Sequence, residues 1–287
     1  VIGDLPIVSW PWTRRCVGRA GEFPVGSTGA VPTDGIRCAA RLLQRRWPTV
    51  GRIPVYRWDR MQADGFGWWI RRIDGAGKLY DVIRIDHFRG FESYWAVPYG
   101  ETTAKNGRWV KGPGMALVGV LIGWFPQLEF IAEDLGYPTP EVAQLLRDSG
   151  LPGMKVLEFA FDSRDTSSYL PHSYGENCIC YTGTHDNSPL ALWRQEADPA
   201  DIAFAKEYLG LNDEEGFNRG SHSGRHEFCG QAVCGSDAGL SGAGAGHRTN
   251  EPGTQSGNWQ WRMLPGELTP ELAQRIRKLT RIYGRLA

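Results

Sequence analysis

Three carboxylic acids, Asp86, Glu133 and Asp186, stand out in this chain because each follows an apolar run. The runs cover residues 79–85, 128–132 and 178–182, and their composition is typical of buried strands. The strands of a parallel barrel end on one common face, where the chemistry of such barrels takes place. Three carboxylates on that face would suit the cleavage of a glycosidic bond, which needs a pair of carboxyl groups.

Asp86 has the surroundings expected of a nucleophile. Arg84 lies two residues earlier in the same run, so both side chains would point to the same face of a strand. A neighbouring cation favours the ionised carboxylate. We therefore expect Asp86 to attack the anomeric carbon in a retaining mechanism, in which the two carboxyl groups lie about 5–5.5 Å apart.

Glu133 would supply the proton in that mechanism. It follows the apolar residues 130–132, and partial burial raises the pKa of a carboxyl group, as a general acid requires. Asp186 would contact sugar hydroxyls and stabilise positive charge that develops on the ring. His87 and His185 are adjacent to two of the acids, and we expect both to hydrogen-bond to the same sugar.

The same residues also allow structural and metal-binding interpretations. An acid at the end of a strand is often the N-cap of the next helix, and Asp134 is best interpreted as a loop or capping residue. A single histidine is more often structural than catalytic. Three acids on successive strand ends could instead bind Mg²⁺, as in barrels that use a Lys or His base. Arg84 argues against this, because its guanidinium would compete with the metal ion.

Alternating strands and helices must position these acids. The pattern predicts helices over residues 61–73, 114–124, 139–148 and 198–208, and strands over 1–7, 79–86, 128–133, 154–161 and 177–182. Thr139 is expected to be an N-cap, since Pro140 suits the first helical position. The alternation indicates parallel βα units and an α/β fold, and 287 residues suffice for one barrel of about 250.

The composition limits the partners and the compartment. Lys+Arg and Asp+Glu both number 32, which favours neither nucleic acid nor a membrane as partner. No apolar run approaches the roughly 18 residues of a membrane span, and no secretory signal is visible. The six cysteines contain no CxxC pair, so no zinc site is expected and a reducing cytoplasm is the simplest location.

Two stretches, residues 9–52 and 219–246, fit neither a helical nor a strand pattern. The first holds eight Arg and no Lys, and the second is dominated by Gly and Ser. Four of the six cysteines lie within them. A flexible loop and a disordered basic arm are two interpretations of such composition.

Five motifs resemble the 4-α-glucanotransferases known as amylomaltase or disproportionating enzyme. They are RIDHFRGF at 84–91, NGRWVKGPG at 106–114, IAEDLG at 131–136, LPGMKV at 151–156 and YTGTHDN at 181–187. The similarity covers about residues 54–217 and 245–287, together with the opening 2–7. It implies a (β/α)₈ barrel of the α-amylase-like type.

The resemblance implies the same catalytic roles for Asp86, Glu133 and Asp186. It adds a set of substrate-binding residues, namely Asp4, Arg84, His87, His185, Arg248 and Asn250. The implied reaction transfers an α-1,4-glucan segment from one maltooligosaccharide or glucan to the 4-hydroxyl of another glucan or of glucose. No cofactor and no metal are expected.

Enzymes of the resembled family are longer on the N-terminal side. We therefore expect residues 1–287 to be the C-terminal part of one catalytic barrel domain, which is incomplete because its first strands are missing. The opening residues lack an initiator Met and have the composition of a core strand, which agrees with this expectation. The family pattern is present before and after each of the stretches 9–52 and 219–246, and it is lost within them. Compensating frameshifts in the DNA are a third interpretation of these stretches, which translation of the other reading frames would test.

Two other functions remain open at this point. An α-glucan hydrolase could use the same carboxylates, because transfer additionally requires that water be excluded from the glycosyl-enzyme. An inactive truncated fragment, or a residual glucan-binding protein, is the alternative outside enzymes. The expected location is the cytoplasm, or a plastid if the source is a plant.

Overall fold

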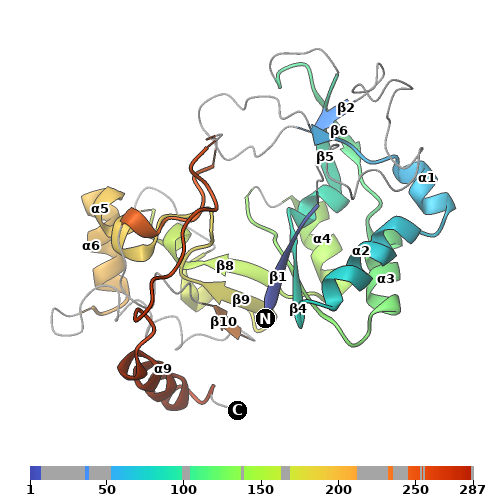
Figure 1. Cartoon of the computed structure of the whole chain (residues 1–287). Helices are drawn as coiled ribbons and strands as arrows, with labels where there is room; N and C mark the ends of the chain where they lie inside the picture. Colours follow the sequence, from blue (N-terminus) through green and yellow to red (C-terminus); the bar gives the residue numbers. More distant parts are fainter. Residues whose placement is uncertain are drawn as a thin grey trace. The chain divides into compact units, whose positions relative to one another are not determined.

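The computed structural model describes residues 1–7, 36–38, 53–98, 104–136, 139–162, 169–211, 232–234, 245–252, 254 and 256–285, which are drawn as ribbons in Figure 1. They belong to two compact units, residues 1–153 and 154–287, and each unit is described by itself. Most of the stretches 9–52 and 219–246 lies outside the described residues. None of the helices in the described ranges is long and apolar enough to cross a membrane.

A parallel sheet of three strands forms the centre of the first unit. Its order is β1 (Ile2–Pro6), β4 (Val82–Asp86) and β7 (Glu129–Ala132), and Figure 1 shows β1 and β4 side by side. Asp4 pairs with Arg84, and Ile85 pairs with Ala132. This register brings Asp86 and Glu133 to the same edge of the sheet, as the sequence predicts, although β4 begins later than residue 79.

Four helices cover this sheet or pack on one another. They are α1 (Trp58–Ala63), α2 (Gly67–Gly77), α3 (Met115–Trp124) and α4 (Pro140–Ser149). The helix α2 contacts β4, and α3 lies between α2 and α4 in the packing. The core beneath them includes the fully buried Trp69, Ile73, Ile83, Leu117 and Leu121. Burial of such side chains contributes about 1.5–3 kcal/mol each.

The single helix predicted over 61–73 is wrong. Gly65 and Phe66 have φ of 70° and 59°, in the left-handed region, and this turn separates α1 from α2. Phe66 is only 2% exposed, so the turn places its ring in the core. Burial of the ring offsets the strain of left-handed backbone at a residue with a Cβ.

The N-cap predicted for the fourth helix is confirmed. The Thr139 hydroxyl accepts a hydrogen bond of 3.4 Å from the Val142 amide, and Pro140 occupies the first helical position. Glu141 follows in the first turn, where a negative charge interacts favourably with the helix dipole. Gly150 ends the helix with φ of 68°, which glycine adopts without strain.

An antiparallel sheet extends the first unit beyond the end of β4. The short helix η1 (Phe88–Phe91) leads from β4 into β5 (Ser93–Pro98), which pairs with β6 (Arg108–Lys111). The sheet has the order β3-β2-β5-β6, with β2 at Ile36–Cys38 and β3 at Ile53–Pro54. Trp95 and Trp109 lie opposite each other in this sheet, with ring centroids 5.4 Å apart.

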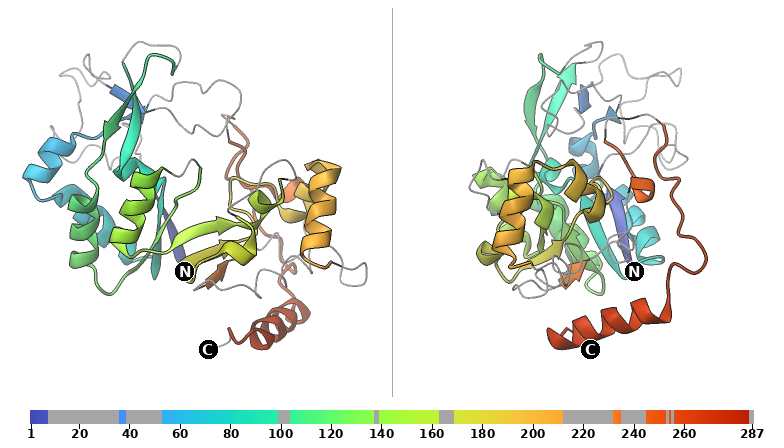
Figure 2. Two further views of the ribbon diagram at one scale, coloured as in Figure 1. Left: turned by 180° about the vertical axis from the view of Figure 1, so that it is seen from behind. Right: turned by 90° about the vertical axis from the view of Figure 1, so that its left-hand side faces the viewer.

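The second unit contains a three-stranded sheet of order β10-β9-β8. The strands are β8 (Gly153–Val156), β9 (Cys178–Tyr181) and β10 (Ala232–Cys234), and β9 runs parallel to β10. The helices are η2 (Leu157–Phe161), η3 (Pro171–Ser173), α5 (Leu190–Glu196), α6 (Pro199–Tyr208), η4 (Ala245–His247) and α9 (Pro270–Ile282). Figure 2 shows α9 at the periphery of this unit, and only Leu272 of that helix is buried.

The strand predicted over 154–161 is correct only in its first half. β8 ends at Val156, and the chain turns into η2, where the Glu158 amide donates a hydrogen bond of 3.1 Å to the Thr182 carbonyl. The helical turn places Leu157, Ala160 and Phe161 on one side, where they pack with Leu190 and other residues of the second core. An apolar run of this length does not by itself distinguish a strand from a helical turn.

Candidate active site

Arg84 is the centre of the polar cluster in the first unit. Its Nε lies 2.8 Å from the Asp4 Oδ1, and its Nη2 lies 3.2 Å from the Asp86 Oδ1. Only 6% of its side chain is exposed, compared with 35% for Asp4 and 21% for Asp86. The pairing of β1 with β4 sets Asp4 directly beside Arg84. The predicted contact between Arg84 and Asp86 is therefore present in the structure.

The guanidinium of Arg84 keeps its positive charge despite its burial. Burial opposes the charged form, but the carboxylates of Asp4, Asp86 and Glu133 outweigh it and raise the pKa of Arg84. Because the guanidinium remains charged, it can hold Asp86 ionised and in a fixed orientation.

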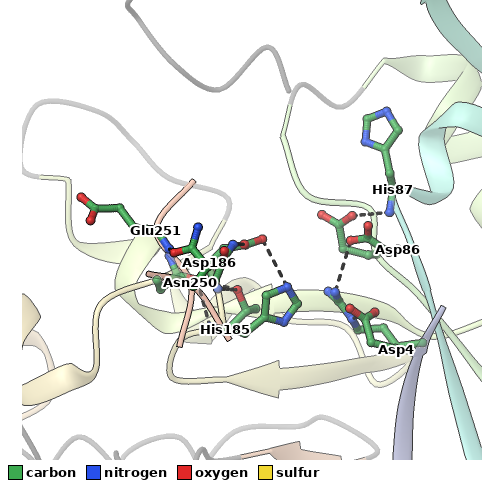
Figure 3. A network of polar contacts seen from close by, with 12 residues as sticks. Asp4, Asp86, His87, His185, Asp186, Asn250 and Glu251 are labelled. Atoms are coloured by element: carbon green, nitrogen blue, oxygen red, sulfur yellow. Dashed lines mark hydrogen bonds and ion pairs between the residues drawn. The ribbon is translucent and has the colours of Figure 1, made fainter. Parts of the chain in front are cut away.

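Glu133 is tied to the end of β4 through its backbone and its side chain. Its amide donates to the Ile85 carbonyl at 3.0 Å, and its carbonyl accepts from the Phe88 amide at 3.0 Å. The backbone N–H of His87 donates to the Glu133 carboxylate, and this contact is drawn in Figure 3. Glu133 is 6% exposed, so its predicted burial is confirmed, whereas its raised pKa stays a prediction.

His87 contributes its backbone more directly than its ring. Its φ of 54° is left-handed, a conformation that residues other than glycine seldom adopt. Figure 3 shows the imidazole pointing away from Asp86, while the amide faces the Glu133 carboxylate. Strained backbone of this kind is concentrated at functional sites, where the surrounding structure maintains it. The predicted contact of the ring with a sugar remains a prediction.

We expect Arg84→Met to destabilise the chain by about 3–5 kcal/mol, because Asp4, Asp86 and the buried Glu133 would lose their shared cation. Urea unfolding at neutral pH measures the change. Arg57→Met is the matched control: Arg57 forms an exposed ion pair with Asp59, and its loss should have a much smaller effect on stability. Equal effects of the two substitutions would contradict a central role of Arg84.

Asp186 is the centre of the polar cluster in the second unit. Its Oδ1 accepts a hydrogen bond of 2.6 Å from the Asn250 Nδ2, and its Oδ2 lies 3.5 Å from the His185 Nε2. Its side chain is 13% exposed. Figure 3 shows Asn250 and His185 on either side of the carboxylate. Asn250 and His185 therefore fix the direction of the Asp186 carboxylate, which fits their predicted place at the site.

A tight turn carries Asp186. The Asn187 Oδ1 accepts hydrogen bonds from the Thr184 amide at 2.9 Å and from the Thr184 hydroxyl at 2.8 Å. The Asn187 amide in turn donates to the Thr184 carbonyl at 3.1 Å. Side-chain hydrogen bonds of this kind define the conformation of short turns. Asn187 thus shapes the turn that carries Asp186.

Arg248 supports this cluster from a second segment. Its Nε donates to the Asn250 carbonyl at 3.2 Å, and its Nη1 donates to the Ser188 hydroxyl at 3.0 Å. Ser188 in turn donates to Glu196 at 2.7 Å. Arg248 therefore holds Asn250 against Asp186, while its predicted contact with substrate stays a prediction. The exposed Glu251 binds Asn258 through its amide and has no assigned role.

The predicted site residues fall into two connected clusters, one in each unit. The first contains Asp4, Arg84, Asp86, His87 and Glu133, and the second contains His185, Asp186, Arg248 and Asn250. Within the described ranges, no group of three or more His, Cys, Asp or Glu residues is placed to hold a metal ion.

Trp259 belongs to the second cluster, and sequence reasoning missed it. Its ring centroid lies 5.0 Å from that of His185, and it is 56% exposed. Its φ of 64° is left-handed, and its amide donates to the Thr249 carbonyl at 2.7 Å. No local sequence signal marks it, because its contact with His185 depends on chain segments far apart in sequence.

Comparison with families of known proteins matches residues 47–268 to a family described as 4-alpha-glucanotransferase. The chain belongs to this family. It is 44% identical over 286 residues to a 4-alpha-glucanotransferase of Clostridium butyricum, covering 99% of this chain and 58% of the relative. It is also 44% identical over 300 residues to the 4-alpha-glucanotransferase of Thermus thermophilus, covering 100% of this chain and 58% of the relative.

Solved structures agree with the family assignment. Amylomaltase from Streptococcus agalactiae in complex with acarbose matches with a TM-score of 0.90 and 32% identity, over 100% of this chain and 58% of that one. Amylomaltase from Corynebacterium glutamicum matches with a TM-score of 0.70 at 20% identity, over 90% of this chain and 41% of that one. The predicted fold, a (β/α)₈ barrel of the α-amylase-like type, is confirmed. The chain spans 58% of the length of these 4-alpha-glucanotransferases.

Proposed function

We propose that this member of the 4-alpha-glucanotransferase family transfers α-1,4-glucan segments by a retaining double displacement. The observation that carries the proposal is the arrangement around Arg84. A buried guanidinium orients Asp86, and the backbone next to Asp86 binds the carboxylate of Glu133. Two carboxyl groups held at neighbouring strand ends, one paired with a cation and one buried, suit the two roles of a retaining enzyme.

In the first step, an Asp86 carboxylate oxygen attacks the anomeric carbon of the donor glucan. Glu133 gives its proton to the departing glycosidic oxygen, so the leaving glucan carries a neutral 4-hydroxyl. The product is an ester between the sugar and Asp86. Asp186, held by Asn250 and His185, stabilises the positive charge that develops on the ring.

In the second step, the 4-hydroxyl of an acceptor glucan or of glucose attacks the same carbon. Glu133, now ionised, takes the proton of that hydroxyl, and the bond to Asp86 breaks. The donors and acceptors are maltooligosaccharides and α-1,4-glucans. Neither a cofactor nor a metal takes part, and nucleic acids and membranes are not partners.

The products from maltotriose distinguish transfer from hydrolysis. We expect glucose, maltose and longer maltooligosaccharides from the beginning of the reaction, since the acceptor is a sugar. Chromatography of early time points measures them, with and without EDTA. Maltose and glucose alone would show a hydrolase. No product, combined with retention on an amylose column, would show a residual glucan-binding protein, and neither product nor retention an inactive fragment.

The location and the domain organisation complete the proposal. We place the protein in the cytoplasm, or in a plastid if its source is a plant. We further propose that residues 1–287 belong to one catalytic barrel domain. The structure of one amylomaltase matches this chain over 100% of its length, which supports that organisation.

A further inference from the structure

Glu158 is a buried acid that the proposed reaction does not use. It lies in η2, one residue after Leu157, and is 7% exposed. Its Oε1 atom has no hydrogen-bond partner among the described residues. A buried carboxyl oxygen without a hydrogen bond lowers the stability of the fold, and an ionised one lowers it far more. The burial of Glu158 therefore needs an explanation.

The carboxyl of Glu158 lies directly against the turn that carries Asp186. A Cβ atom added to Gly183 would come within 2.8 Å of the Glu158 Oε1 and within 3.1 Å of the Asn187 Cβ. A side chain at this position would therefore push against both neighbours. The Glu158 amide also binds the Thr182 carbonyl at 3.1 Å, so the backbone and side chain of Glu158 both contact this segment.

Two charged groups, Arg248 and Glu196, act on this carboxyl together with its burial. Burial raises the pKa of Glu158 well above its usual range, nearby Glu196 raises it further, and Arg248 acts in the opposite direction. The neutral carboxyl is thus the form that this environment favours. Arg248 is the residue that also binds the Asn250 carbonyl and the Ser188 hydroxyl.

We propose that Glu158 is a positioning residue for Asp186, and that its neutral carboxyl supports the turn beneath Gly183. An ionised Glu158 would attract Arg248 away from the Asn250 carbonyl, and Asn250 would then no longer be held against Asp186. A neutral side chain of the same size leaves the Arg248 contacts undisturbed. This inference rests on the proposed function where it concerns turnover, but the charge state of Glu158 is testable without activity.

The pH dependence of stability tests the charge state alone. An acid whose pKa is raised on folding binds more protons in the folded state. Its contribution is complete below the ordinary carboxyl pKa and is lost as the pH rises towards the raised value. Glu158→Gln cannot ionise at this side chain. The Tm of the variant minus the Tm of the parent chain should therefore increase as the pH rises. The exposed Glu207→Gln is the control, and its Tm difference should not change with pH.

Turnover tests the positioning role. Glu158→Ala removes the support beneath Gly183, and we expect kcat to fall by about 10–100-fold with little change in KM, because Asp186 would be misplaced by less than an ångström or so. Glu158→Gln should restore kcat to within about threefold, since it retains the shape without a charge. Gly183→Ala, which pushes against the same carboxyl, should lower kcat as Glu158→Ala does.

Each arm can overturn the proposal. A Tm difference between Glu158→Gln and the parent that does not change with pH would show that the carboxyl is not held neutral. Glu158→Gln as inactive as Glu158→Ala would show that the charged form is needed. Full activity of Glu158→Ala would remove the positioning role. If the parent chain itself does not act on maltotriose, the proposed function is wrong. The pH dependence of the Tm difference still determines the charge state of Glu158.

Discussion

Replacement of Asp86 by Asn is expected to reduce kcat/KM for transfer by on the order of 10⁴-fold or more, the scale seen when a covalent nucleophile is lost. The amide cannot form the glycosyl ester, and no other described carboxylate contacts Arg84 from the same strand. The initial rate of maltotriose conversion measures the effect. Asp74→Asn is the matched control, because Asp74 lies on the exposed surface of α2, where it pairs with Lys78.

A direct assay can separate the chemistry from folding. Quenched reactions should contain a glycosylated peptide, and trypsin would release Asp86 in the short segment 85–89 because Arg84 and Arg89 flank it. The adduct should be absent from Asp86→Asn, whose far-UV spectrum and Tm establish whether it is folded. A folded Asp86→Asn protein with unchanged turnover would refute the nucleophile assignment.

Glu133→Gln is expected to lower turnover of maltotriose by roughly 10²–10⁴-fold, the usual contribution of a general acid–base. The loss in the first step should be much smaller with a maltosyl fluoride donor, since fluoride leaves without a proton. The second step still needs a base to activate the acceptor hydroxyl. The glycosyl-enzyme should therefore accumulate on Asp86 in this variant.

The control for that experiment is Glu129→Gln, an exposed residue at the start of β7. It should behave as the parent chain with both donors. If Glu133→Gln lost the same factor with maltotriose and with maltosyl fluoride, Glu133 would not be the proton donor. Rapid turnover of the fluoride without any accumulated adduct would likewise contradict its role as the base.

The sequence was sufficient to predict the parts of the fold that depend on local patterns. Thr139 followed by Pro140 marks the start of α4, and the apolar runs before Asp86 and Glu133 mark β4 and β7. These signals are local, because capping, proline geometry and apolar runs act within a few residues. The contact of Arg84 with Asp86 was predictable for the same reason, since alternate residues of a strand share one face.

Other features depend on contacts between distant segments, and sequence patterns did not reveal them. Phe66 interrupts a helix because its ring is buried in the core, and η2 places Leu157, Ala160 and Phe161 in the second core. The amide of His87 binds Glu133 although 46 residues separate them. Glu158 itself looks like any polar residue in an apolar run, and only its place beneath Gly183 distinguishes it.

The carboxylates around Arg84 have a consequence for the energetics of the proposed first step. With Glu133 protonated, Asp4 and Asp86 carry two negative charges against one positive charge, and the net charge is −1. When Asp86 becomes an ester, Glu133 has lost its proton, so the net charge is again −1. The negative charge moves from one acid to the other, and both act on the same guanidinium. Arg84 is thus a common counterion for both states, and little reorganisation of the surrounding dipoles is needed between them.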